Sequence, residues 1–175
     1  MESLPRLSLI HIFKTECPEI QNELGEIARM FFHEAVSYDP GEEETITINH
    51  RLTRTTQGMR HDAVAEMDGQ TANGSAMQIA LADGLIGKRY RKYAAKQAVY
   101  RALAELTGRT MPWGGLTGVR PVKMLAQLEE MGLPPAKTLR EQFDVSEERV
   151  ALCQRIAKVQ SQMQVRKSDV CVRCV

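Results

Sequence analysis

Cys171 and Cys174 have the C-x-x-C spacing that can hold one edge of a metal site or form a redox disulfide. Arg173 lies between them and favours the thiolate form. Structural zinc takes about four ligands and an iron–sulfur cluster about three or four, and no second Cys or His pair lies nearby. Short motif matches are common by chance, so the sequence favours the alternative, a disordered tail over residues 166–175.

A second chemically suggestive feature is a group of five cations within nine positions, at the start of a helix expected over residues 88–106. Positive charge opposes the helix dipole there, so an anionic partner could relieve it. A phosphate backbone, an anionic small molecule and the chain's own acidic run at residues 42–44 are the candidates. The alternative, which the sequence favours, is a solvated charged face. The five residues are Lys88, Arg89, Arg91, Lys92 and Lys96.

A third feature, residues 112–121, combines three glycines with the only tryptophan of the chain. The glycines permit positive φ or close backbone approach, and Pro121 suits the first position of a helix. The unpaired N–H groups of that helix start could bind an anion. The sequence favours a structural alternative, a tight turn with its tryptophan in the core. We call residues 109–120 the elbow. The candidate residues of the elbow and of the helix start after it are Trp113, Gly114, Gly115, Thr117, Gly118, Arg120 and Lys123.

The four histidines, His11, His33, His50 and His61, occur singly, with no carboxylate or cysteine at ligand spacing. We expect them on the surface or satisfied within the core. No serine has a nucleophile-elbow pattern, and neither an H-E-x-x-H helix nor a phosphate-loop signature is present. The sequence therefore predicts no catalytic residue and no metal site.

The composition is that of a globular protein. With 175 residues and 43% hydrophobic residues, the chain can form one domain with an appendage or two small domains. A net charge of +1 gives no global attraction to nucleic acid. No run of about eighteen apolar residues is present, and residues 1–14 lack the features of a signal peptide. We expect a cytoplasmic protein without a membrane span, in which Cys17 and Cys153 are core thiols.

The first 108 residues predict an α+β domain in the order β-α-β-β-β-α, with one sheet carrying both helices on one face. Asp-Gly and Asn-Gly pairs place a hairpin loop at residues 68–74, and Gly108 ends the second helix. The expected strands cover residues 7–13, 45–54, 60–67 and 75–81, and the expected helices cover residues 18–35 and 88–106.

The elbow, bounded as residues 109–120, separates this domain from a helical segment at residues 121–165. Helices are expected over residues 121–131, over residues 135–143 and from Ser146 onward. Ser146 is a typical N-cap, and Val145 can pack against Val150. Three short helices bury little surface alone, so we expect the segment to dock on something larger. The last helix has an apolar stripe expected to be buried: Leu152, Ile156, Val159 and Met163.

Residues 113–121, WGGLTGVRP, followed by Lys123 and a helix, resemble the region just before the catalytic barrel of one family. These are the oxygen-independent coproporphyrinogen dehydrogenase-like radical S-adenosylmethionine (radical SAM) proteins. The order of the surrounding elements is also similar, and the resemblance covers most of residues 5–164. The elbow is its specific part.

The resemblance implies a part in haem synthesis, where porphyrinogen propionates are oxidatively decarboxylated to vinyl groups. In that family a 4Fe-4S cluster cleaves S-adenosylmethionine. Its members continue into a C-x-x-x-C-x-x-C loop and a barrel, which do not follow here, so no catalytic or cluster residue is carried over. The chain then corresponds to an N-terminal accessory portion, inactive alone and without a cofactor of its own, whose partner is the barrel.

A second resemblance is to the double-stranded-RNA-binding domain, because residues 18–106 have the order α-β-β-β-α. Residues 58–61 would lie between strands, and the second helix would begin with the family's basic positions. Met59 replaces the usual proline, Tyr93 replaces a lysine, and the net charge is nearly neutral, so we do not expect nucleic acid as a partner. A scaffold that only stabilises the barrel is a third possibility. The matching positions on the second helix are Lys92, Ala95 and Lys96.

Overall fold

The structure is a computed structural model that describes residues 10–32, 36–37, 46–79 and 84–163. In this part of the chain the fold is α+β, as the sequence predicts, with a sheet of strand order β2-β1-β3-β4-β5. Strand β1 is parallel to β2 and β3, whereas β3, β4 and β5 form an antiparallel meander. The elements are β1 (Ile10–Thr15), a 3-10 turn (Pro18–Ile20), α1 (Gln21–Phe32), β2 (Val36–Ser37), β3 (Ile46–Thr55), β4 (Gly58–Met67), β5 (Gln70–Met77) and α2 (Gly84–Thr107).

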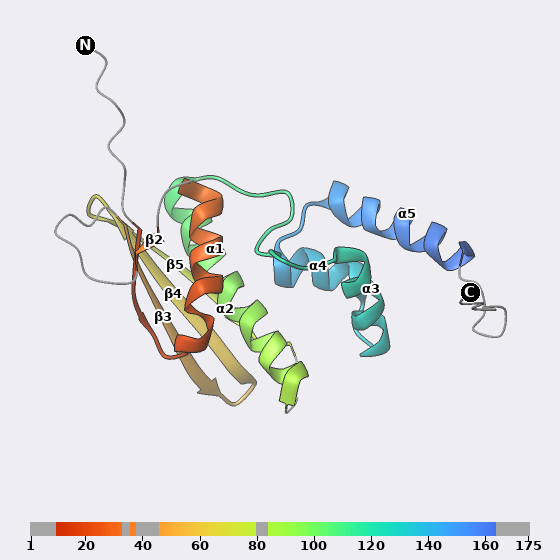
Figure 1. Cartoon of the computed structure of the whole chain (residues 1–175), viewed down its shortest axis with the longest axis horizontal. Coiled ribbons are helices and arrows are strands. Elements are labelled where there is room, and N and C mark those ends of the chain that lie inside the picture. The colour runs from red at the N-terminus through yellow and green to blue at the C-terminus, as the bar shows by residue number, and fades with distance from the viewer. Residues whose placement is uncertain (1–9, 33–35, 38–45, 80–83, 164–175) are drawn as a thin grey trace, which may run out of the picture.

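Helices α1 and α2 cover one face of the sheet (Figure 1), and the main core lies between these two layers. Its large members include Phe31 and Tyr100. Many of the buried core residues on α2 and on the strands are alanine, whose small side chain lets helix and strands approach closely. At Gly74 of β5, an added Cβ atom would lie 2.1 Å from the carbonyl oxygen of Ala98 on α2, so only glycine fits.

The turn between β4 and β5 differs from the sequence prediction. Asp68 and Gly69 have φ angles of 50° and 75°, which makes a two-residue hairpin turn, and β5 begins directly afterward at Gln70. The predicted loop at residues 68–74 is therefore wrong and the strand predicted at 75–81 begins five residues earlier, because the Asn73-Gly74 pair belongs to the strand that packs against α2. The short strand β2 was not predicted, and α2 begins four residues earlier than expected.

The predicted helices after the elbow are present. They are α3 (Pro121–Glu130), α4 (Pro135–Phe143) and α5 (Glu147–Met163), and they enclose a second hydrophobic cluster. Ser146 caps α5, since its Oγ atom accepts a hydrogen bond of 3.4 Å from the Arg149 N–H. Val145 and Val150 are both buried in this cluster, as expected for residues that pack across a helix start.

The apolar stripe of α5 is buried only in part, which corrects the prediction. Leu152 is half-buried, but Ile156 and Val159 are 38% and 53% exposed. Helix α5 has 17 residues whereas α3 and α4 have 10 and 9, so its second half extends past them (Figure 1). The Met163 side chain lies outside the described residues.

Candidate functional site

The elbow lies where the main core meets the helical segment, and its first two glycines are required by contacts. Gly114 has a φ angle of 56°, and a Cβ atom there would lie 1.8 Å from the Phe143 carbonyl oxygen. At Gly115, a Cβ atom would lie 2.4 Å from Oε1 of Gln97 on α2. The elbow therefore passes between α2 and the end of α4 at a distance that side chains do not permit.

Backbone hydrogen bonds connect the elbow to the helical segment. The Gly115 N–H donates to the Phe143 carbonyl at 3.2 Å, and the Ser146 N–H donates to the Pro112 carbonyl at 3.0 Å. On the other side, the hydroxyl of Tyr100 accepts a hydrogen bond of 2.9 Å from the Met111 N–H. The segment is thus fixed at both ends, to α2 and to the α4–α5 connection.

Lys96 does not belong to an open basic face. Its side chain is 5% exposed, and its Nζ atom donates a hydrogen bond of 2.8 Å to the carbonyl oxygen of Thr117 in the elbow. Burial lowers the pKa of this ammonium group, and the nearby carboxylates of Glu26 and Glu23 partly offset the effect. Lys96 is therefore a structural residue that holds the elbow against α2.

Asp144 makes the corresponding connection from α4 to α2. It ends α4 in the left-handed region, with a φ angle of 53°. Its carboxylate accepts hydrogen bonds from Nε2 of Gln97 at 2.6 Å and from Nε of Arg101 at 2.8 Å. A second Arg101 nitrogen donates to the other carboxylate oxygen at 3.0 Å. This two-point contact fixes the end of α4 on α2.

Trp113 packs against the second hydrophobic cluster and is only partly buried. The guanidinium carbon of Arg149, on α5, lies 5.6 Å from the centre of its ring, within cation–π range. The side chain thus supports the elbow from the α5 side.

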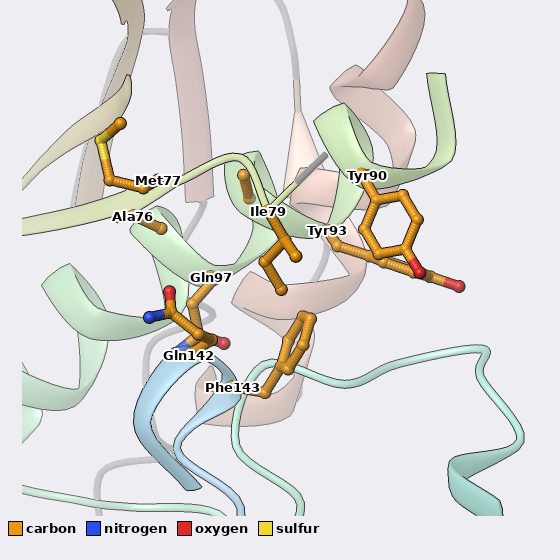
Figure 2. Close-up of a pocket in the computed structure, with 9 residues that line it drawn as sticks. Ala76, Met77, Ile79, Tyr90, Tyr93, Gln97, Gln142 and Phe143 are labelled. Atoms are coloured by element: carbon orange, nitrogen blue, oxygen red, sulfur yellow. The ribbon is translucent and has the colours of Figure 1, made fainter. Parts of the chain in front are cut away.

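The small cavity at this junction, drawn in Figure 2, is not a ligand site. It lies between the end of β5, α2 and α4, and Ile79, Tyr93, Gln97 and Phe143 are among its lining residues. Its volume is about 10 Å³, roughly the space of a single water molecule. The junction is packed, so the role of the elbow here is structural: it holds the helical segment against α2.

A larger hollow brings together the two basic features of the sequence. It has a volume of about 360 Å³ and lies between the start of α2 and the start of α3. Three cations line it: Arg89 from α2, and Arg120 and Lys123 from the elbow and α3. We call it the cationic hollow, and its other lining residues are Tyr93, Gly118, Val119 and Gln127.

The remaining cations of the basic helix are arranged differently. Arg91 lies 3.7 Å from the carboxylate of Glu19, and Lys92 forms an ion pair with Glu23. Glu19 lies in the 3-10 turn before α1 and Glu23 lies on α1, so this turn and helix supply the counter-charges. The acidic run at residues 42–44, which the sequence offered for that role, lies outside the described residues. Lys88 is exposed to solvent.

His50 and His61 form a buried pair that the sequence analysis missed. Nε2 of His50 lies 2.9 Å from Nδ1 of His61, and Oγ1 of Thr15 lies 2.9 Å from Nδ1 of His50. The histidines are 2% and 0% exposed. His50 and His61 lie in the core, one of the two places expected for them, but their pairing was not predicted. It follows from the β3–β4 register, which pairs Leu52 with His61 and makes the two rings diagonal neighbours. A prediction of the strand register, in addition to the strands themselves, was needed to find the pair.

The environment favours the neutral form of both rings. Burial, together with smaller effects of the neighbouring His50 and Arg91, lowers the pKa of His61 to about 3. Burial also lowers the pKa of His50. Thr15, His50 and His61 thus connect β1, β3 and β4 by a hydrogen-bonded chain. The side chains of His11 and His33 lie outside the described residues.

The cysteines of the described residues do not fit an iron–sulfur cluster. Cys17 is buried in the main core and Cys153 in the second cluster, as predicted for core thiols, and burial raises the pKa of both. Cys171 and Cys174 lie outside the described residues. Within the described ranges, no three His, Cys, Asp or Glu side chains gather where they could hold a metal ion.

Comparison with known proteins does not assign the chain to a family. No protein-family model, curated protein or solved structure matches the chain. None of the helices in the described part of the chain has the length and apolar character needed to cross a membrane. The structure therefore leaves two features to interpret: the elbow, which fixes the helical segment on α2, and the cationic hollow beside it.

Proposed function

We propose that this chain is the N-terminal accessory portion of a coproporphyrinogen dehydrogenase-like radical SAM protein of haem biosynthesis. In this proposal the chain is cytoplasmic and non-catalytic, and its partner is the radical SAM barrel, which carries S-adenosylmethionine and the 4Fe-4S cluster. The proposal starts from the resemblance of residues 113–121 to the segment that precedes the barrel in that family.

The observation that carries the proposal is the way the elbow is built. A Cβ atom at Gly114 would meet the backbone of Phe143, and one at Gly115 would displace the Gln97 side-chain amide. The Thr117 carbonyl accepts a hydrogen bond from the Lys96 ammonium. The residues that carry the resemblance are therefore those that fix the helical segment on the α+β layer. An accessory module needs such a fixed arrangement in order to present a surface of constant geometry to a second domain.

The surface presented is the second half of α5. Ile156 and Val159 are exposed there, on the helix that directly precedes the barrel in the order of the family. Large exposed apolar side chains grouped on one helix favour contact with another protein surface. We therefore assign this part of α5 to the contact with the barrel.

Binding of double-stranded RNA is the alternative, and the topology favours it. Helix α1, the β3–β5 meander and α2 have the α-β-β-β-α order, with both helices on one face. The basic positions weigh against it, because Lys96 is buried against Thr117 and Lys92 is paired with Glu23. We expect weak binding or none.

Reconstitution with iron and sulfide tests the proposal. The purified chain should give no stoichiometric four-iron absorption and no cleavage of S-adenosylmethionine. Addition of the chain to a separately produced barrel of the family should raise the unfolding temperature of the reconstituted barrel. Cleavage by the chain alone, or a barrel unaffected by the chain, would contradict the proposal.

A further inference from the structure

We infer that the cationic hollow between α2 and α3 binds a phosphate group of a small molecule. Its volume of about 360 Å³ lies at the lower end of the range for small-molecule sites. Arg89 enters from α2, more than twenty residues before the other two cations, so the fold rather than local sequence brings the charges together. This assignment does not depend on the proposed function.

Charge balance is the main argument. Arg89, Arg120 and Lys123 form no ion pair with any described residue, whereas Arg91 and Lys92 on the same helix pair with Glu19 and Glu23. Among the described residues, none that lines the hollow is acidic. Three like charges in one concave site repel each other. A bound dianion would offset this repulsion, because it attracts all three cations.

The types of the cations indicate phosphate rather than a single carboxylate. Two guanidinium groups can each donate paired hydrogen bonds to oxyanion oxygens, and the ammonium of Lys123 adds a further charge. Three positive charges match a group that carries about two negative charges at neutral pH better than a group that carries one.

The walls of the hollow are fixed before any ligand arrives. The Tyr93 ring makes edge contacts with Tyr90 and Phe143, at centroid distances of 5.7 and 6.0 Å. Figure 2 shows its side chain extending away from Gln97 and Gln142. On the opposite wall, the Lys96–Thr117 hydrogen bond holds the residue directly before Gly118. Rigid walls reduce the entropic cost of binding.

The start of α3 adds to the positive potential of the site. The side chain of Arg120, the residue before this helix, makes no capping hydrogen bond, and Pro121 occupies its first turn. The first helical hydrogen bond from the backbone is that of the Met124 N–H to the Arg120 carbonyl, at 3.1 Å. The N–H groups ahead of it carry the partial positive charge of a helix start, beside Arg120 and Lys123.

Calorimetric titration of the full chain with inorganic phosphate and with pyrophosphate tests the assignment. We expect saturable binding, tighter for pyrophosphate and weaker at high salt. Arg89→Gln, Arg120→Gln and Lys123→Gln should each weaken it about tenfold, because each removes a charge-assisted hydrogen bond. Lys158→Gln removes an exposed cation on α5 and is the matched control, which should bind like the unmodified chain.

Three results would overturn the assignment. The first is the absence of saturable binding at millimolar pyrophosphate, and the second is equal affinity in the hollow variants and the Lys158→Gln control. The third is tighter binding of a short double-stranded RNA that the same three variants abolish, which would make the hollow a site for a nucleic-acid backbone instead. Unchanged unfolding midpoints of the variants show that any loss of binding comes from the site.

Discussion

The ammonium group of Lys96 donates a hydrogen bond of 2.8 Å to the carbonyl oxygen of Thr117. This contact joins the basic helix to the glycine elbow, two features that are separate in the sequence. It removes one cation from the solvent-facing group and uses it to position the loop that leads into α3. The cationic hollow lies beside this contact, because Gly118, the residue after Thr117, is one of its lining residues.

Lys96→Met should destabilise the protein by about 1–3 kcal/mol, because the Thr117 carbonyl would lose its partner in a partly buried position. Lys92→Gln removes a partly exposed ion pair with Glu23 and should cost less than about 1 kcal/mol. Urea unfolding of both variants measures the difference. If Lys96→Met is as stable as the unmodified chain, the buried ammonium does not hold the elbow.

Gly114→Ala should be among the most damaging substitutions of the elbow, at more than about 3 kcal/mol, because its Cβ atom would meet the backbone of Phe143 at 1.8 Å. Gly118→Ala is the matched control. It has a similar φ angle of 65° but no atom within 4 Å of the added Cβ, so only the backbone strain of about 1 kcal/mol remains. Equal losses in urea unfolding would show that the close approach to α4 is not what requires glycine.

Trp113→Ala should cost about 2–3 kcal/mol, less than a fully buried indole would, because the ring is only partly buried. Arg149→Ala, which removes the cation above the ring, should cost under about 1 kcal/mol. Thermal unfolding of the two variants separates packing from the cation–π contact. A neutral Trp113→Ala would mean that the indole does not support the elbow.

The buried histidine pair predicts a loss of stability in acid. The pKa of His61 is about 3 in the folded chain, against 6.5 when unfolded, so the unfolded state takes up the proton first. Stability should fall as the pH drops below about 6.5, by at most about 1.4 kcal/mol per pH unit for each such histidine.

The measurement is the free energy of unfolding between pH 7 and pH 5, a window above the titration of most carboxylates. His61→Leu removes one titrating ring and should show a shallower decline than the unmodified chain. Identical slopes would show that His61 does not titrate differently in the folded and unfolded states.

Patterns of hydrophobic residues predicted most of the fold, because local periodicity determines which face of each element is apolar. They failed where contacts between elements far apart in the sequence determine the role of a residue. Gly74 looks like a turn residue, but it is glycine because α2 packs against β5 there. The stripe through Ile156 and Val159 predicts an apolar face, but not which part of it α3 and α4 cover.

The residues of the candidate site could be predicted from the sequence, but the contacts between them could not. The elbow glycines and the cations of the hollow are visible in the sequence, because glycine and charge clusters stand out locally. The Lys96–Thr117 bond spans twenty-one positions, and the His50–His61 pair depends on strand register. Neither follows from composition or from helical and strand periodicity.

Binding of this chain to a separately produced radical SAM barrel of the coproporphyrinogen dehydrogenase-like family tests the central claim most directly. Calorimetric titration should give a one-to-one complex, weakened at least about tenfold by the double variant Ile156→Glu/Val159→Glu, which places charge on the exposed apolar part of α5. Gln154→Glu, on the opposite side of α5, should leave the affinity unchanged. No measurable complex, or equal affinity for the double variant and the control, would contradict the account.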